Sequence, residues 1–318
     1  MNGGIGRIEM LKKTNILALV GGGKVPCFPP HILIIWDDHQ GKIISKLRFN
    51  ENILNIRLRN DKIIAIFENK IYIFNLNTLE TISIINSYIN PTGIIGISNG
   101  DNNKLILAFP FECQGTLFLG DIISEKVDKV QKIKAHDSQI SCISVNKDGT
   151  LLATSSDKGT LIRIFTTIDG AKISEFRRGT TYVEMNNISF DPHNKFLGCS
   201  SNAGTIHIFS LSGIMKVLKE DNNVDNKKGR NTFDEEPKNS KSLLGKIGGL
   251  LGVKSSYLET ERNFAKYKVQ EENSLLGFGY DNTIVVITME GKYYKAAYDP
   301  KKGGDCCKIE EKNIFVDN

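Results

Sequence analysis

The stretch from Leu151 to Phe165 reads LLATSSDKGTLIRIF and decides the fold class. Two short apolar runs flank the polar turn between Ser155 and Thr160. Apolar runs of this length on both sides of a glycine-containing turn are typical of a β-hairpin. The stretch therefore predicts two antiparallel strands joined by a tight turn.

Similar hairpins recur along the chain at a nearly constant spacing. The first runs begin at Ile16, Ile63, Leu105, Leu151 and Phe196, so that successive starts are 47, 42, 46 and 45 residues apart, and a sixth begins at Leu275. Second runs follow at Ile32 to Trp36, Ile71 to Phe74, Thr116 to Leu119, Leu161 to Phe165, Ile206 to Phe209 and Ile284 to Ile287. A period of about 40–45 residues with several strands per unit is typical of a WD40-type β-propeller. Since no helical periodicity lies between the units, we expect one all-β propeller domain over residues 1–318, with six visible blade units.

The interval from Phe196 to Leu275 is 79 residues, far longer than the others. The excess lies at residues 213–262, which are polar and rich in Asn and Lys, and we expect a flexible surface insertion there rather than a further blade. One apolar patch within it has the spacing of a single helix face; its members are Leu243, Leu244, Ile247, Leu250 and Leu251. The flanking Lys246 and Lys254 suit an anionic membrane interface. The alternative is a plain linker, because four glycines in the patch each weaken a helix by up to ~1 kcal/mol.

Composition narrows the classes of function. The chain has 318 residues, a formal charge of +5 and a pI near 8.7, which fits an anionic surface as partner but not a dedicated nucleic-acid binder. The six cysteines have no C-x-x-C spacing, so we expect reduced thiols, no metal site and no cofactor. No apolar run approaches the ~20 residues that cross a bilayer, and the first residues do not have the pattern of a signal peptide. We therefore expect a cytoplasmic protein whose membrane contact is peripheral.

The sharpest chemical feature is Phe176-Arg177-Arg178-Gly179. Adjacent side chains on a strand point to opposite sides, so the two arginines are expected to serve two different pockets. The planar guanidinium group fits phosphate oxygens with two parallel hydrogen bonds. Gly179 would let a ligand approach the backbone or would adopt a turn conformation closed to other residues. Taken alone, the motif could equally be a solvated charge pair at a turn.

The units on either side of this motif are alike. Ala153 to Phe165 and Cys199 to Phe209 share the form S-S-x-x-G-T-x-x-x-[IF]. Hydroxyl groups therefore occur at equivalent places on neighbouring blades, accompanied by Arg163 in one and His207 in the other. Hydroxyls, an imidazole and one or two guanidinium groups are what a phosphorylated sugar ring needs for orientation and charge balance.

In this context the sequence resembles the PROPPIN family, the WIPI-type phosphoinositide-binding propellers of autophagy. The likeness extends over most of the chain and includes, in order, GRIEMLKKTNILALVGGGK, ILIIWDD, NPTG, KLILAFP, FRRG, GTIHIF, FAKYKV and MEGKYYK. It implies a seven-bladed propeller. Only six units are visible in this chain. Family members have about one more blade-forming segment before the stretch that begins here at Gly3. The N-terminal blade is therefore expected to be incomplete.

The resemblance also implies two binding sites for phosphatidylinositol 3-phosphate and phosphatidylinositol 3,5-bisphosphate. Carried over by motif, the first site comprises His136, Thr154, Thr160, Arg163 and Arg177. The second site comprises Arg178, Gly179, Thr181, Ser201, Thr205 and His207. In the family, the long loop of the sixth blade inserts into the bilayer, which implies that residues 213–262 are a flexible, membrane-facing loop inserted in the sixth blade.

The expected function is that of a peripheral phosphoinositide effector that recruits autophagy or organelle-membrane machinery and is not an enzyme. The expected protein partner is an autophagy lipid-transfer protein on blades remote from FRRG, and the host membrane is autophagosomal, endosomal, vacuolar or plastid. A protein-only WD40 scaffold that binds acidic peptides is the main alternative. A propeller hydrolase is a third, because distant blades can assemble catalytic residues that no local motif reveals.

Overall fold

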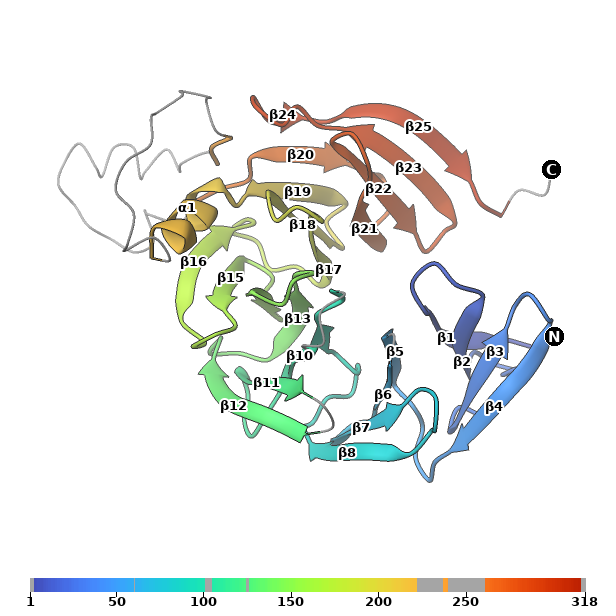
Figure 1. Cartoon of the computed structure of the whole chain (residues 1–318). Helices are drawn as coiled ribbons and strands as arrows, with labels where there is room; N and C mark the ends of the chain where they lie inside the picture. Colours follow the sequence, from blue (N-terminus) through green and yellow to red (C-terminus); the bar gives the residue numbers. More distant parts are fainter. Residues whose placement is uncertain are drawn as a thin grey trace. The chain divides into compact units, whose positions relative to one another are not determined.

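The computed structural model describes residues 3–59, 61–100, 105–123, 126–221, 237–239 and 261–315. The regular secondary structure of this part of the chain is almost entirely β-strand, mostly antiparallel and arranged in six sheets (Figure 1). The chain divides into two compact units, Met1–Ile95 with Asn103–Lys132 and Gly96–Asn102 with Ile133–Asn318. The prediction of an all-β fold is confirmed.

In the first unit, each sheet is built from strands that follow one another in the chain. One sheet has the order β1 (Ile5–Met10), β2 (Ile16–Gly21), β3 (Ile32–Asp37) and β4 (Lys42–Arg48). The next has the order β5 (Asn55–Arg59), β6 (Lys62–Ile66), β7 (Lys70–Asn75) and β8 (Thr81–Asn86). A third contains β10 (Leu105–Pro110), β11 (Thr116–Ile123) and β12 (Lys126–Lys134).

The second unit begins with the short β9 (Gly96–Ile97) and contains three further sheets. The β13 sheet runs β13 (Ile140–Val145), β14 (Leu151–Ser156), β15 (Leu161–Thr166) and β16 (Lys172–Arg177). The β17 sheet runs β17 (Met185–Phe190), β18 (Phe196–Ser201), β19 (Thr205–Ser210), β20 (Ala265–Lys268) and β24 (Gly304–Asp305), the last pairing in parallel. The β21 sheet runs β21 (Ser274–Phe278), β22 (Thr283–Thr288), β23 (Lys292–Ala297) and β25 (Cys307–Asn313).

The repeated apolar runs are the most buried strands of these sheets. Every residue of β6, β10, β14 and β18 is buried, because both faces of these strands are covered. A strand covered on both faces has a continuous apolar sequence rather than an alternating one. By contrast, β4 at the edge of its sheet alternates between exposed and half-buried residues. Each apolar run is therefore an inner strand of one sheet, and the spacing between runs equals the length of one repeat.

The glycine shared by the two S-S-x-x-G-T motifs is needed by the backbone. Gly159 in the β14–β15 hairpin and Gly204 in the β18–β19 hairpin have φ values of 61° and 67°. A Cβ atom at Gly159 would lie 2.2 Å from the Val183 carbonyl oxygen, and one at Gly204 would lie 2.8 Å from that of Val269. The conformation and the close approach of a neighbouring chain both select glycine. The hairpins are thereby fixed at the same point on adjacent sheets.

The sixth predicted unit is offset by one strand from the other five. The run at Leu275 lies in β21, the first strand of its sheet, whereas the runs at Leu151 and Phe196 lie in second strands. The long interval therefore contains β20, which completes the preceding sheet across the insertion. Periodicity missed this strand because AKYK is only four residues long and alternates between buried and exposed positions.

A helix follows β19 where the sequence predicted a loop. It is α1 (Ser212–Asp221), so the first residues of the predicted 213–262 loop are helical. Ile214 is buried in the core between the β13 and β17 sheets, and Met215 packs against the same core. Figure 1 shows α1 beside the ends of β16 and β19.

Candidate functional site

The arginine pair lies where β16 ends. The ring of the preceding Phe176 is fully buried and stacks on Phe209 of the β17 sheet, with centroids 4.9 Å apart and an interplanar angle of 11°. The amide of Arg177 donates to the Glu261 carbonyl at 2.8 Å, and that of Arg178 donates to the Thr160 carbonyl at 2.9 Å. Because Phe176 points into the core between the two sheets, Arg177 lies on the opposite face of β16 and Arg178 follows on the core side.

Three residues of the predicted first site meet on one face of the β13 sheet. His136 Nε2 and Thr154 Oγ1 are 2.9 Å apart and both side chains are buried. Arg163 is paired in register with Thr154 on one side and with Glu175 on the other. Arg177 belongs to the same face, two residues beyond Glu175, and is 9% exposed. The structure thus brings together His136, Thr154 and Arg163, with Arg177 at the end of the same row.

Arg163 is already oriented by two protein groups. Its Nε donates to Glu175 Oε2 at 2.8 Å, and its Nη1 donates to the Ala135 carbonyl at 2.6 Å. Sequence reasoning did not identify Glu175 as part of this site. The available signal was its position two residues before Arg177, which places both side chains on the same face of the strand. Thr160 contributes its carbonyl to Arg178 and Gly179, and so supports the turn.

The predicted second site lies between the end of β16 and one face of the β17 sheet. Arg178 Nε donates to the Gly159 carbonyl at 2.6 Å, and its Nη2 donates to the Thr181 carbonyl. His207 is paired in register with Cys199, and the charge of Arg178 acts on both of these side chains. Ser201 and Thr205 belong to the same face of the sheet by strand alternation. This part of the structure therefore places Arg178 beside His207.

His207 leaves one polar atom without a partner. Its Nδ1 is buried and has no hydrogen-bond partner among the residues that the structure describes. Buried polar atoms in proteins are normally hydrogen-bonded, and an exception calls for an explanation such as an absent ligand.

Gly179 has neither of the backbone features that select glycine. It is absent from the residues with positive φ, and a Cβ atom at this position would meet no heavy atom within 4 Å. The prediction that it adopts a conformation closed to other residues is therefore wrong. The open space beside its Cα remains compatible with the other prediction, close approach of a ligand to the backbone.

Two lysines that sequence reasoning did not assign border the second site. In register, Lys266 of β20 lies opposite His207, and Lys268 lies opposite Thr205. Both lysines are exposed, whereas the alternate residues Ala265 and Tyr267 are buried. Both lysines belong to the motif FAKYKV, but the sequence did not show that this segment pairs with β19, because the insertion separates the two strands in the chain.

Both site histidines are uncharged at neutral pH. Burial, reinforced by the charge of Arg163, lowers the pKa of His136 to about 4. Burial, reinforced by the charge of Arg178, lowers the pKa of His207 to about 4 as well. Each imidazole can therefore act as a neutral hydrogen-bonding group, and each can gain a proton when an anion binds beside it.

The depressed pKa of His136 predicts a specific loss of stability in acid. A histidine in the unfolded chain titrates near pH 6.5, so between about pH 6.5 and 4 the unfolded state binds a proton that the folded state does not. Stability falls as the pH falls through this window. His136→Gln is expected to remove about 2 kcal/mol of this loss between pH 6.5 and 4.5, measured by urea unfolding. His39→Gln, at an exposed position, is the matched control, and equal losses in wild type and His136→Gln would contradict the assignment.

Some predicted features fall outside the described residues. Leu243, Leu244, Ile247, Leu250 and Leu251 lie in residues 240–260, which the structure does not describe. None of the described helices is both long enough and apolar enough to cross a membrane. All six cysteines are free, and the described residues contain no cluster of three or more His, Cys, Asp or Glu side chains that could hold a metal ion.

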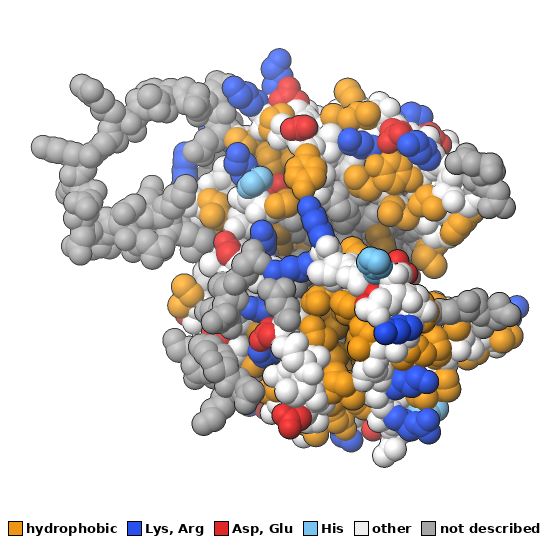
Figure 2. Space-filling view, turned by 45° about the vertical axis from the view of Figure 1, so that its right-hand side comes forward, with side chains coloured by type: hydrophobic (Ala, Val, Ile, Leu, Met, Phe, Trp, Pro, Cys, Tyr) orange, Lys and Arg blue, Asp and Glu red, His pale blue; other side chains and the backbone are white. Residues whose placement is uncertain are grey.

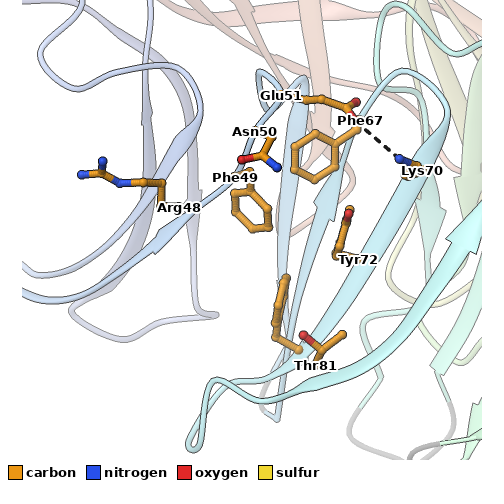
Figure 3. A pocket seen from close by; sticks show the side chains of 9 residues that line it. Arg48, Phe49, Asn50, Glu51, Phe67, Lys70, Tyr72 and Thr81 are labelled. Carbon is orange, nitrogen blue, oxygen red and sulfur yellow. Dashed lines mark ion pairs between the residues drawn. The ribbon is translucent and has the colours of Figure 1, made fainter.

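The first unit contains a separate pocket with an aromatic floor (Figure 3). Its volume is about 350 Å³, and it lies between the end of β4 and strands β7 and β8. Glu51 and Lys70 form an ion pair of 3.5 Å at its rim. The lining residues are Arg48, Phe49, Asn50, Glu51, Phe67, Lys70, Tyr72, Phe74 and Thr81. The pocket combines apolar surface with charges of both signs, a composition typical of protein recognition.

Two solved structures share this fold. Kluyveromyces lactis Hsv2 superposes with a TM-score of 0.72 at 21% identity, covering 98% of this chain and 87% of that one. KlAtg21, solved in complex with the coiled coil of AgAtg16, gives a TM-score of 0.73 at 21% identity, with coverages of 97% and 84%. The chain is therefore a β-propeller protein, as its repeats predicted.

Sequence comparison gives the family. The PROPPIN model matches residues 24–315. Autophagy-related protein 18e of Arabidopsis thaliana is 31% identical over 309 residues, which span 96% of this chain and 76% of that protein. Autophagy-related protein 18 of Dictyostelium discoideum is 30% identical over 330 residues, with coverages of 99% and 84%. The chain belongs to the PROPPIN family, so the resemblance stated from its motifs is confirmed.

Proposed function

We propose that this protein binds phosphatidylinositol 3-phosphate and phosphatidylinositol 3,5-bisphosphate through the first and second sites, and so docks peripherally on membranes. A phosphoinositide-binding role in autophagy agrees with its membership of the PROPPIN family. The observation that carries the proposal is the separation of two consecutive arginines. Arg177 lies on the face of β16 that also carries Glu175, the partner of Arg163, whereas Arg178 lies beside His207.

The chemistry of each site suits a phosphorylated inositol ring. A guanidinium group offers paired donors to phosphate oxygens, and a neutral imidazole and hydroxyl groups can hydrogen-bond the ring hydroxyls. Figure 2 shows Lys and Arg side chains in separate places among acidic and hydrophobic ones, so on that face no broad basic surface competes with the two sites. The proposed role consists of binding alone, with no catalytic step.

The apolar patch of residues 243–251 is proposed to anchor the protein in the bilayer beside the headgroup sites. Its sequence has leucines and isoleucine at helical spacing, with lysines on either side. Two weak headgroup contacts and one apolar contact would act together on a single membrane. The cytoplasmic protein would then be recruited to autophagosomal, endosomal, vacuolar or plastid membranes that display these lipids.

Liposome flotation tests the proposed function directly. Vesicles with equal surface charge should contain phosphatidylserine alone, phosphatidylinositol 4-phosphate, phosphatidylinositol 3-phosphate or phosphatidylinositol 3,5-bisphosphate. Flotation with the last two only is expected. Equal flotation with all four would mean that general charge attraction, rather than headgroup recognition, carries the binding. Flotation with none, combined with capture of an acidic peptide, would favour a protein-only scaffold.

We further propose that the pocket of the first unit receives the protein partner, an autophagy lipid-transfer protein. Support comes from its aromatic floor and mixed charges, and from its distance in sequence from the FRRG motif. Tyr72→Ala with Lys70→Glu should abolish capture of such a partner in a pull-down while leaving liposome flotation unchanged. Unchanged capture would remove the pocket from this role.

A further inference from the structure

The first and second sites differ in the charged groups that surround their arginines. At the first site, the Glu175 carboxylate accepts a hydrogen bond from Arg163 at 2.8 Å and lies 3.7 Å from Lys172 Nζ. The side chains of Arg163 and Glu175 are 23% and 20% exposed, so this ion pair is partly shielded from water. Arg177 and Lys172 add positive charge to this site, so its distinguishing feature is a partly shielded carboxylate set directly against Arg163.

The second site has the opposite arrangement. Lys266 and Lys268 of β20 lie on the same face as His207 and Thr205, directly across from them in register. Lys266 Nζ lies 3.4 Å from Asp305 Oδ1, a carboxylate that is 81% exposed and thus well screened by solvent. Lys268 has no ion-pair partner in the described part of the chain. Two lysines are thus added to Arg178, while its neighbour His207 is uncharged.

We propose that the first and second sites are matched to headgroups with different numbers of phosphates, an inference that rests on the proposed function. The first site takes a ring with a single phosphate besides the diester, as in phosphatidylinositol 3-phosphate. The second site takes a ring with two, as in phosphatidylinositol 3,5-bisphosphate. Glu175 is the specificity-determining residue of the first site, and Lys266 and Lys268 are those of the second.

The difference depends on where the negative charge lies, since the carboxylate of the first site is 20% exposed and that of the second is 81% exposed. An additional phosphate brought to the first site would face the Glu175 carboxylate, and like charges a few ångströms apart repel in a partly buried setting. The same phosphate at the second site would face ammonium groups, which bind phosphate well as mobile point charges. Each lysine stem is anchored on a strand, so both ammonium groups project from the sheet face that carries His207.

Single-site variants allow each site to be measured alone. Arg178→Ala leaves the first site, and Arg163→Ala leaves the second. Isothermal titration with the soluble headgroups inositol 1,3-bisphosphate and inositol 1,3,5-trisphosphate gives the affinity ratio of each variant. Arg178→Ala is expected to prefer the bisphosphate and Arg163→Ala the trisphosphate.

Charge-specific variants then test the named residues. In the Arg178→Ala background, Glu175→Gln keeps the hydrogen-bond acceptor and should raise trisphosphate affinity about fivefold. In the Arg163→Ala background, Lys266→Gln with Lys268→Gln should lower trisphosphate affinity about tenfold while leaving bisphosphate affinity within about twofold. Lys42→Gln with Lys46→Gln, which removes the same charge from exposed positions of β4, is the matched control and should change neither affinity.

The outcomes separate this inference from the proposed function. If both single-site variants bind headgroups with the same preference, the proposed function stands and the charge assignment is overturned. If the lysine pair and its control reduce trisphosphate affinity equally, the effect is one of net charge and the assignment of Lys266 and Lys268 is overturned. If wild type binds neither headgroup, the proposed function itself fails.

Discussion

Replacing Arg177 and Arg178 together with alanine is expected to abolish flotation on liposomes containing phosphatidylinositol 3-phosphate, whereas each single replacement weakens it. Arg177 ends β16 on the face away from the core and Arg178 follows on the core side, so under the proposed function each serves its own site. Linked sites can gain about 10²–10⁴ in apparent affinity over either one alone. Loss of one site therefore removes the gain from linkage, and loss of both removes headgroup binding altogether.

Conservative variants make this test sharper. Arg177→Lys and Arg178→Lys keep the charge but lose the paired donors, and each should weaken binding nearly as much as alanine. Because Arg177 is only 9% exposed, the thermal midpoint of each variant must be measured beside its flotation. The two-site assignment would be wrong if one arginine could be replaced without effect while replacement of the other removed all binding.

Replacing Leu244, Ile247 and Leu251 with aspartate is expected to remove most liposome binding but to leave binding of soluble headgroups intact. Full burial of one such side chain is worth about 1.5–3 kcal/mol, and three aspartates would also be repelled by an anionic surface. The proposed headgroup sites lie on the β13 and β17 sheets and contain none of these residues. Flotation and calorimetric titration of inositol 1,3-bisphosphate on the same variant provide the comparison.

A matched control introduces the same three negative charges at polar positions of the insertion instead of apolar ones. Asp substitutions at three polar positions of the same insertion, Asn222, Asn223 and Asn226, should leave flotation nearly unchanged. Higher salt should weaken headgroup titration more than apolar anchoring, since exposed charges are screened over about 8–10 Å at physiological ionic strength. If the Leu244, Ile247 and Leu251 variant loses soluble headgroup binding as well, these residues belong to the fold or to a pocket, and the anchor assignment fails.

The strands were predictable because their signal is local. The apolar runs from Ile16 to Phe196 coincide with β2, β6, β10, β14 and β18, and the last four of these strands are buried along their whole length. The offset at Leu275 could not be foreseen, since β20 pairs with β19 only after the insertion has been crossed. Helix α1 was missed for a related reason: its burial comes from a core between two sheets.

Some residues of the candidate sites could be predicted from local motifs, whereas others could be found only from strand pairing. His136, Thr154 and Arg163 could be named from motif positions, and the structure brings them together. Glu175 and Lys268 were not named, because their relevance comes from strand register rather than from their own sequence context. A short motif identifies residues within one repeat. The charged residues that surround a site come from neighbouring strands, and only the strand register shows which ones they are.

The pairing of β19 with β20 has a consequence for how this protein can vary. These strands are neighbours in one sheet, although residues 211–264 separate them in the chain. The entropy of closing such a connection rises only slowly with length, by about 0.6 kcal/mol for each doubling. Insertions and deletions there cost the sheet little, so the length and apolar content of the connection can diverge between lineages while the pairing of β19 with β20 stays fixed. Under the proposed function, such changes would alter membrane avidity and leave lipid recognition as it is.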